Sequence, residues 1–433
     1  MELFLIFVLS ILFFILIVND YKFNIFSSPK KLDFTFNVLV VLLITITMVK
    51  TIGGNFINKT LVSGLSIVLM IASFAFLYVN RKKTLINPYI ITLILYLALN
   101  IIVCNPHQIF MSWQRLFLFI IVLTIASPLF INRVAYLFRR YCIIWGQLLC
   151  IIISAVSFVC YFIDINLMTY EGKYLEDYEY IGGHFSGITN QSMMLGPIAG
   201  ISVLSLLCDF FSFKKTKKWS LLIICTGTLL FSASRAAIVA TLIGVICALL
   251  IQRRNKKHFM RKTIVPLVVL LMLFPLWDSA LNGIRQKNAS RADSGRFESR
   301  TDKFEGRLHE FASSPIFGIG YGVIRLSRLH TLSNVSIEPG SSWLGILSMT
   351  GIIGFVIFFL FYFKCWTIVR RNELDIQQKA FLMALLSFFA VNMIFEGYIY
   401  AGGSPLCLLV WLVLGVSYDC KYKYLYDSKD VKK

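Results

Sequence analysis

Apolar runs of the length that a membrane requires recur along almost the whole chain. The hydrocarbon core of a bilayer is about 30 Å thick, and a helix needs about 20 mostly apolar residues to cross it. Because backbone groups in lipid must be hydrogen-bonded within the protein, each run predicts a helix. The sequence therefore predicts an all-α polytopic integral membrane protein with about 12–13 transmembrane helices. Thirteen candidates lie near residues 2–18, 34–49, 61–79, 86–104, 116–131, 141–163, 193–213, 219–232, 233–251, 263–277, 343–363, 378–398 and 404–418.

The charge balance fits a membrane protein better than a nucleic-acid-binding one. The chain is 58% hydrophobic and 15% charged, with a net charge of +20, whereas soluble proteins are about 45–50% apolar and about 25% charged. Basic residues gather in alternate short loops, which is typical of cytoplasmic loops in polytopic proteins. This alternation excludes nucleic-acid binding as the reason for the net positive charge.

The same bias predicts the orientation of the chain. Lys and Arg place the C-terminus in the cytoplasm, and thirteen spans then place the N-terminus outside. The two long loops lie outside as well. The expected division is N-terminal helices in 1–163, an outer loop in 164–192, central helices in 193–277, a large outer loop in 278–342, C-terminal helices in 343–418 and a cytoplasmic tail in 419–433.

Externally placed arginines are the main candidates for chemistry, because a guanidinium suits bidentate capture of phosphate or carboxylate. Arg235 lies between two apolar runs at the outer boundary, where an ionisable residue is expensive and indicates function. The alternative is a snorkelling side chain that anchors a helix end. Arg296, Arg300 and Arg307 follow helical spacing in the large loop, and their alternative is an ordinary solvated helix.

Four elements between residues 184 and 354 resemble one family. The segment 307–322 (RLHEFASSPIFGIGYG) resembles the Arg–aromatic–Pro–Gly-x-Gly-x-Gly signature of the O-antigen ligase/polymerase superfamily. The other three, 232–237 (SASRAA), 184–191 (HFSGITNQ) and 338–354, resemble further elements of that family in the same order. The element at 184–191 has a shorter Gly-to-Asn spacing than the family. Many ligases carry His-Asn where this chain has Gly340-Ser341, and this departure favours a Wzy-type polysaccharide polymerase.

The resemblance implies a membrane glycosyltransferase of GT-C-like architecture in the bacterial inner membrane, with its active site facing the periplasm. Its substrate would be an oligosaccharide on undecaprenyl diphosphate, within membrane lipid, and a chain-length regulator is a candidate partner. No metal and no cofactor is expected. The alternatives are an O-antigen ligase acting on lipid A-core, a polymerase for capsule or exopolysaccharide, and a transporter of lipid-linked oligosaccharide.

The implied site residues fall into two groups. Arg235 and Arg307 are expected to clamp the diphosphate, and the base is sought among histidines and acids, with Glu310 a further candidate. The catalytic candidates are Arg235, Arg307, His330, His184 and Glu338, and the substrate-binding candidates are Arg296, Arg300, Asn190, Gly318 and Gly320.

Overall fold

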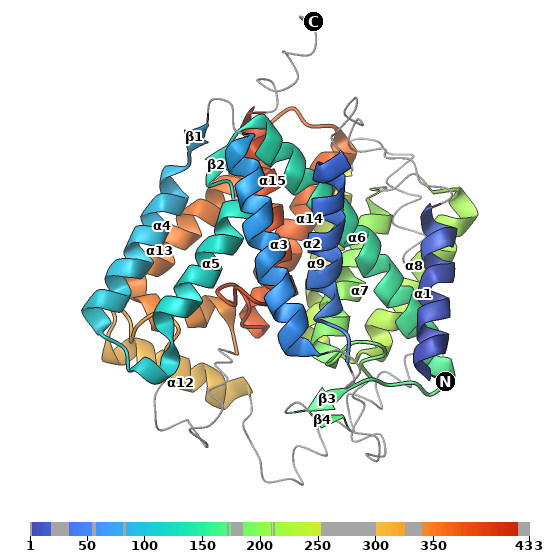
Figure 1. Ribbon diagram of the computed structural model, residues 1–433, viewed down its shortest axis with the longest axis horizontal. Coiled ribbons are helices and arrows are strands. Elements are labelled where there is room, and N and C mark those ends of the chain that lie inside the picture. The colour runs from blue at the N-terminus through green and yellow to red at the C-terminus, as the bar shows by residue number, and fades with distance from the viewer. Residues whose placement is uncertain are drawn as a thin grey trace, which may run out of the picture. The chain divides into compact units, whose positions relative to one another are not determined.

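The computed structural model describes most of the chain, and regular structure within the described part is almost entirely α-helical (Figure 1). The described residues are 2–18, 34–53, 58–80, 84–170, 173–174, 185–208, 210, 213–252, 300–324 and 340–422. The helices are α1 (Glu2–Val18), α2 (Phe34–Val49), α3 (Lys59–Val79), α4 (Pro88–Cys104), η1 (Gln108–Phe110), α5 (Ser112–Ala126), α6 (Arg133–Phe162), α7 (Ser192–Leu207), α8 (Lys215–Phe231), α9 (Arg235–Gln252), α12 (Arg300–Ser313), α13 (Ser342–Arg371), α14 (Ile376–Phe395), α15 (Pro405–Asp419) and η3 (Cys420–Tyr422).

Strands are minor connectors between these helices. Strand β1 (Leu85–Ile86) pairs antiparallel with β2 (Phe130–Ile131), and β3 (Thr169–Tyr170) pairs antiparallel with β4 (Lys173–Tyr174). Ladders of two residues cannot form a layer of their own, since strands in ordinary sheets run to about five or six residues. The described fold is therefore all-α, as the sequence predicts.

Helices occupy twelve of the thirteen predicted apolar segments, counted within the described residues. The remaining segment, 263–277, lies outside them. Seven helices of the described part are long and apolar enough to cross a membrane: α3, η1 with α5, α6, α9, α13, α14, and α15 with η3. The chain is therefore a multi-pass membrane protein, while the total of 12–13 crossings remains a prediction.

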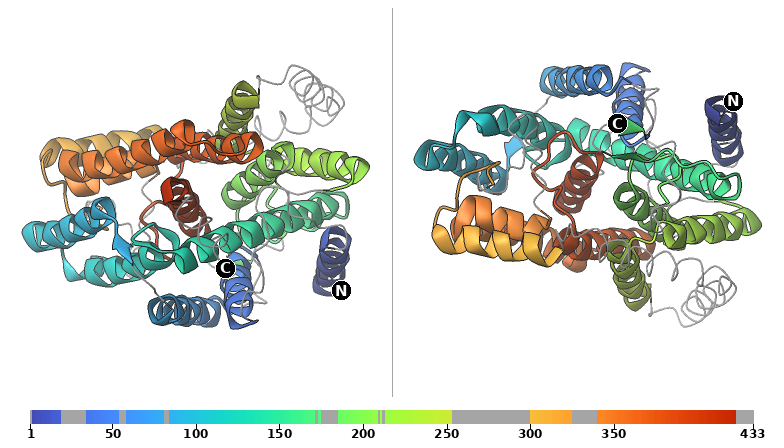
Figure 2. Two further views of the ribbon diagram at one scale, coloured as in Figure 1. Left: turned by 90° about the horizontal axis from the view of Figure 1, so that it is seen from above. Right: turned by 90° about the horizontal axis from the view of Figure 1, so that it is seen from below.

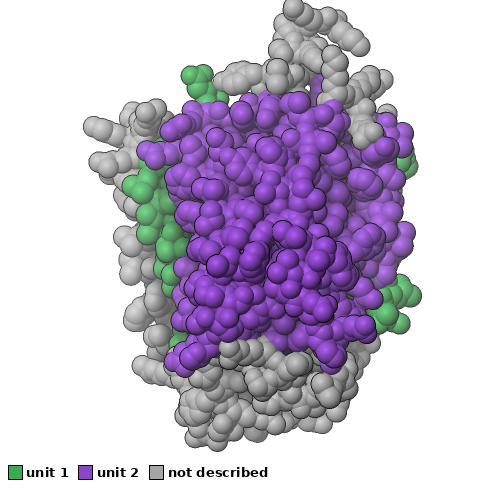
Figure 3. Space-filling view, turned by 90° about the vertical axis from the view of Figure 1, so that its left-hand side faces the viewer, with its two compact units in different colours: residues 1–63, 144–297, 373–392 green, residues 64–143, 298–372, 393–433 purple. Residues whose placement is uncertain are grey.

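Two compact units divide the chain, and Figure 3 colours them separately. Each unit is built from three stretches of sequence, so neither is a contiguous domain. Unit 1 comprises residues 1–63, 144–297 and 373–392, and unit 2 comprises residues 64–143, 298–372 and 393–433.

In unit 1, α7 is the central helix and packs against both α8 and α9. Small polar side chains line its contact with the second half of α6, where the Ser154 and Ser202 hydroxyls lie 3.3 Å apart. The Thr228 hydroxyl of α8 donates to the Ser154 carbonyl at 2.8 Å. Each of these hydroxyls also bonds within the helices, so the polar groups are satisfied where water is excluded.

In unit 2, aromatic side chains join α5, α13 and α15. The Trp411 ring of α15 is fully buried and lies 5.6 Å from the Phe119 ring and 6.0 Å from the Phe361 ring. Helix α4 packs against α13 and α5, and α12 lies beside α13 in both views of Figure 2. Large aromatic groups contribute much of the burial energy of such a core.

The start of α6 differs from the prediction. The apolar run indicates a helix from about residue 141, whereas α6 begins at Arg133 and includes Arg139. That side chain is fully buried, because its guanidinium pairs with Asp419 at 2.7 Å and donates to the Ser127 carbonyl. A hydropathy run stops at a charge, but the helix continues because a distant carboxylate compensates that charge.

Candidate functional site

The glycine-rich loop 315–322 is held against a break in α13. Gly351 interrupts that helix with φ 65° and ψ −169°. The break exposes backbone groups, and the loop uses them: Ile319 N–H donates to the Ser348 carbonyl at 2.9 Å, and Ile352 N–H donates to the Pro315 carbonyl at 2.9 Å. Loop and helix are thus joined backbone to backbone.

Helix α13 folds back on itself at this break. The rings of Trp343 and Phe358 are 5.6 Å apart, and those of Trp343 and Tyr362 are also 5.6 Å apart. In a straight helix, residues 343 and 358 would be separated by about 22 Å at 1.5 Å per residue. The first part of α13 therefore doubles back beside the second, and this bend shapes the site.

The first two glycines of the loop have a structural explanation. Gly318 adopts φ 77°, and a Cβ there would lie 2.5 Å from the Met349 carbonyl carbon. Gly320 adopts φ 114°, and its N–H donates to the Met349 carbonyl at 3.1 Å. Such backbone angles and close approaches favour glycine. The predicted role of Gly318 and Gly320 in substrate binding remains a prediction.

Arg307 lies in a buried ion pair. Its Nη1 is 2.8 Å from Oε2 of Glu310, one turn further along α12. It also donates to the Ser348 hydroxyl at 3.2 Å and the Val323 carbonyl at 3.4 Å. Arg307 is 3% exposed and Glu310 is 0% exposed. For Arg307, the alternative of an ordinary solvated helix is therefore wrong.

A pocket of about 310 Å³ lies in the same unit, beside the wall that Arg307 contacts. Arg115 of α5 lines it, together with the first part of α13 and the loop before α15. The full lining is Arg115, Leu118, Tyr321, Gly322, Ser342, Gly345, Ile346, Met349, Gly397, Ile399, Tyr400, Ala401, Gly402, Gly403 and Ser404. Two lining residues, Met349 and Gly322, are next in sequence to Ser348 and Val323, which Arg307 contacts.

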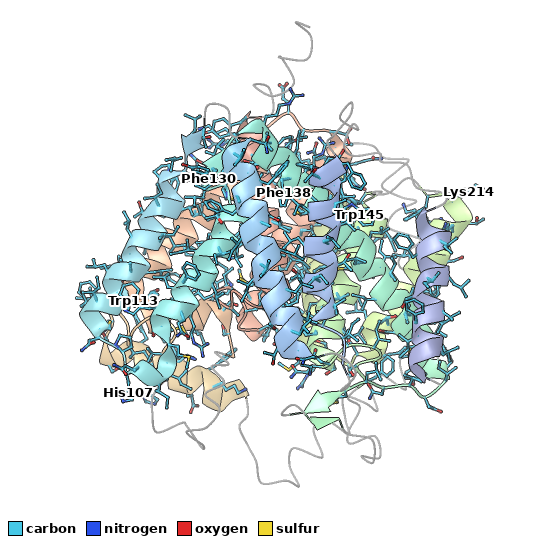
Figure 4. All side chains as sticks on the ribbon, in the orientation of Figure 1. His107, Trp113, Phe130, Phe138, Trp145 and Lys214 are labelled. Atoms are coloured by element: carbon cyan, nitrogen blue, oxygen red, sulfur yellow. The ribbon has the colours of Figure 1, made fainter. Side chains whose placement is uncertain are left out.

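The sequence interpretation missed Arg115. It lies one residue before the apolar run predicted at 116–131, and so it reads as a boundary charge. Figure 4 labels Trp113, two residues earlier, at the lower end of α5. The signal that could have found Arg115 is its side of the membrane, because the charge rule places the connection between α4 and α5 outside, with the large loop.

In unit 1, the starts of α7 and α9 lie at the same end. A Cβ on Gly196 would meet Ser234, one on Gly200 would meet Thr241, and one on Gly244 would meet Leu204. The partners advance together along both helices, so α7 and α9 run parallel. Arg235 is the first residue of α9 and is exposed at that end.

Asn190, just before α7, belongs to the same end of unit 1. Its N–H donates to the Thr51 carbonyl at 2.7 Å. Gly187 fixes the preceding turn with φ 54°, packed against Ser157 of α6. The parallel packing of α7 and α9 thus brings two predicted site residues, Asn190 and Arg235, to one end of one unit.

Several predicted residues are not placed. They lie outside the described residues, and their roles remain predictions: His184, Arg296, His330 and Glu338. Arg300 is the first residue of α12, and only its backbone is described.

Residues 220–359 match the family described as O-antigen ligase. The matched segment begins in α8 and runs through α9, α12 and the bend of α13. It contains Arg235, the Arg307–Glu310 pair and the glycine-rich loop, whereas Arg115 lies outside it. No curated protein matches the chain.

Proposed function

We propose that the chain is a membrane glycosyltransferase and polysaccharide polymerase of the O-antigen ligase/polymerase superfamily, which the match over residues 220–359 supports. In this proposal it transfers a glycan from undecaprenyl diphosphate to a second lipid-linked glycan at the periplasmic face of the inner membrane. The family match supports the glycosyltransferase part of this proposal, and it covers α12 and the bend of α13 together.

The proposed reaction needs fixed positive charge more than a strong acid. The bond from the anomeric carbon to the diphosphate oxygen breaks, and the diphosphate leaves with the electron pair. The acceptor hydroxyl oxygen forms the new glycosidic bond and releases its proton to a base or to water. Preorganised cations that meet the departing charge stabilise such a transition state. We propose that Arg235, which is exposed, makes this contact with the diphosphate. Arg307 is proposed as a second contact.

The residue at position 341 supports a polymerase over a ligase. Where many ligases carry His-Asn, this chain has Gly340 and Ser341. The Ser341 side chain is buried, accepts a hydrogen bond from Leu344 N–H at 3.3 Å and donates to the Met393 carbonyl at 3.3 Å. A serine used as a helix cap supplies no imidazole base at this place.

A gel of surface polysaccharide from a deletion strain tests this assignment. Loss of a polymerase should leave lipid A-core carrying a single repeat unit, and the wild-type gene should restore the ladder. Lipid A-core without any repeat unit would instead identify a ligase and refute the proposal. An unchanged ladder together with loss of another surface polymer would move the polymerase to capsule or exopolysaccharide.

A further inference from the structure

The glycine-rich loop is held on a second side by one face of α4. Tyr96, Asn100 and Cys104 are spaced four residues apart in that helix, and residues with this spacing lie on the same helix face. The side chain of each contacts a backbone oxygen of the loop or of the bend in α13. Helix α4, the loop and α13 all belong to unit 2.

Asn100 makes the most specific of these contacts. Its Nδ2 donates to the Phe317 carbonyl at 2.5 Å, and its Oδ1 accepts from Tyr321 N–H at 2.7 Å. One amide side chain thus joins the two ends of the segment 317–321. Asn100 is fully buried, and a buried backbone group that loses its partner pays the full cost of its desolvation.

Tyr96, one turn before Asn100, extends the contact to the bend. Its hydroxyl donates to the Thr350 carbonyl at 2.6 Å. Thr350 directly precedes Gly351, where α13 is interrupted. Helix α4 therefore holds the bend as well as the loop that packs on the bend.

Cys104, one turn after Asn100, lies where the loop comes closest to α4. Its thiol is 3.5 Å from the Gly318 carbonyl. Gly320 N–H donates to the Met349 carbonyl of α13, whereas a Cβ on Gly320 would lie 3.2 Å from Cβ of Cys104. At Gly320 the loop is thus enclosed between α13 on one side and α4 on the other.

The part of the loop that Asn100 holds leads directly into the pocket. Tyr321, whose N–H bonds to Asn100, lines the pocket together with Gly322. The Tyr321 hydroxyl also donates to the carbonyl of Tyr400, another lining residue, at 3.4 Å. A displacement of the loop at Asn100 would therefore move the pocket wall.

We infer that Asn100 is a positioning residue for the reaction, because it fixes the glycine-rich loop between α4 and α13. It acts through the loop and is not a catalytic residue. The inference rests on the proposed function for the activity to be measured, and on the contacts within unit 2 for the geometry. The matched segment 220–359 contains the loop and the bend, but not α4.

Two variants weaken this face of α4 to different degrees. Asn100→Leu keeps a similar volume and removes both hydrogen bonds. Tyr96→Phe keeps the ring and removes one hydrogen bond, so it is the milder change. Asn87→Leu is the matched control, because Asn87 is also fully buried but caps the opposite end of α4, where it accepts from Tyr89 N–H at 3.0 Å, and does not line the pocket.

Hydrogen–deuterium exchange of the purified full-length protein measures the attachment of the loop without any substrate. Ile319 N–H and Gly320 N–H bond to carbonyls of α13, so they report whether the loop stays in place and not merely whether the bonds of Asn100 are lost. We expect both amides to exchange about tenfold faster in Asn100→Leu. Tyr96→Phe should give a smaller increase, and Asn87→Leu should keep the wild-type rates.

Chain growth by folded protein, measured well below its melting temperature, is the second readout. We expect kcat with saturating lipid-linked repeat unit to fall about tenfold or more in Asn100→Leu, because a misplacement of about 1 Å in a site can cost about a hundredfold in rate. Tyr96→Phe should show a smaller fall. Asn87→Leu should keep the wild-type kcat even where it melts at a lower temperature, so loss of stability alone does not produce the effect.

Two results would overturn the inference. One is wild-type exchange at Ile319 and Gly320 in the folded variants of Asn100 and Tyr96. The other is faster exchange at these amides together with a kcat equal to that of Asn87→Leu. A wild-type protein that makes no polymer would refute the proposed function alone, and the exchange rates would still decide whether Asn100 holds the loop.

Discussion

Removing Arg307 should destabilise the part of unit 2 around α12 rather than only stop the reaction. Glu310 is fully buried, and its carboxylate would lose a guanidinium at 2.8 Å. Breaking a buried ion pair by deleting one partner costs about 3–5 kcal/mol. Since proteins are stable by only about 5–15 kcal/mol, Arg307→Ala should accumulate poorly and melt at a clearly lower temperature than the wild type.

Replacing both residues of the pair separates its role in stability from a role in the reaction. Replacing both charges by apolar groups of similar size is often near neutral in stability, so Arg307→Met with Glu310→Leu should recover most of the loss seen in either single variant. Melting of the detergent-solubilised proteins measures this coupling. Arg307→Ala as stable as the wild type, or a double variant that loses the sum of both single losses, would refute the reasoning. If stability returns without chain elongation, the Arg307–Glu310 pair serves the reaction as well as the fold.

Three other outcomes follow from the structure. Arg235 is exposed, so Arg235→Ala should keep normal protein levels and abolish polymer growth, whereas Arg133→Ala should leave both protein level and polymer growth normal. Arg235→Lys should impair growth strongly because the planar fork is lost. Growth at the normal rate in Arg235→Ala, scored on a polysaccharide gel, would exclude the contact. Gly318→Ala should lower the melting temperature, because positive φ costs a side chain about 1–3 kcal/mol and the Cβ would meet backbone at 2.5 Å; equal melting would contradict the packing. A reporter fused after Lys218 should be cytoplasmic and one within 285–335 periplasmic, and a cytoplasmic signal from the large loop would overturn the orientation.

Hydropathy alone predicts most of the helices, because a span must be apolar over its whole length. It fails where a charge is neutralised from afar. Arg139 lies inside α6 because Asp419 pairs with it, and 280 residues separate the two in sequence. Local patterns carry no information about such a partner.

The candidate site was only partly predictable for the same reason. The glycine motif and Arg235 stand out in the sequence, and α7 and α9 bring Asn190 to the end that carries Arg235. The fold-back of α13 at Gly351 does not stand out, because its helical pattern continues on both sides of the glycine. The pocket cannot be predicted without that bend, and Arg115 is then indistinguishable from other charges at a helix boundary.

Chain growth by the purified full-length protein is the decisive measurement for a polymerase. The protein is incubated with a lipid-linked repeat unit as both donor and acceptor, and the products are separated by length. A polymerase should produce a ladder of longer lipid-linked glycans, with one undecaprenyl diphosphate released for each bond formed. Repeat units that stay at their original length, while the same protein transfers them to added lipid A-core, would contradict it.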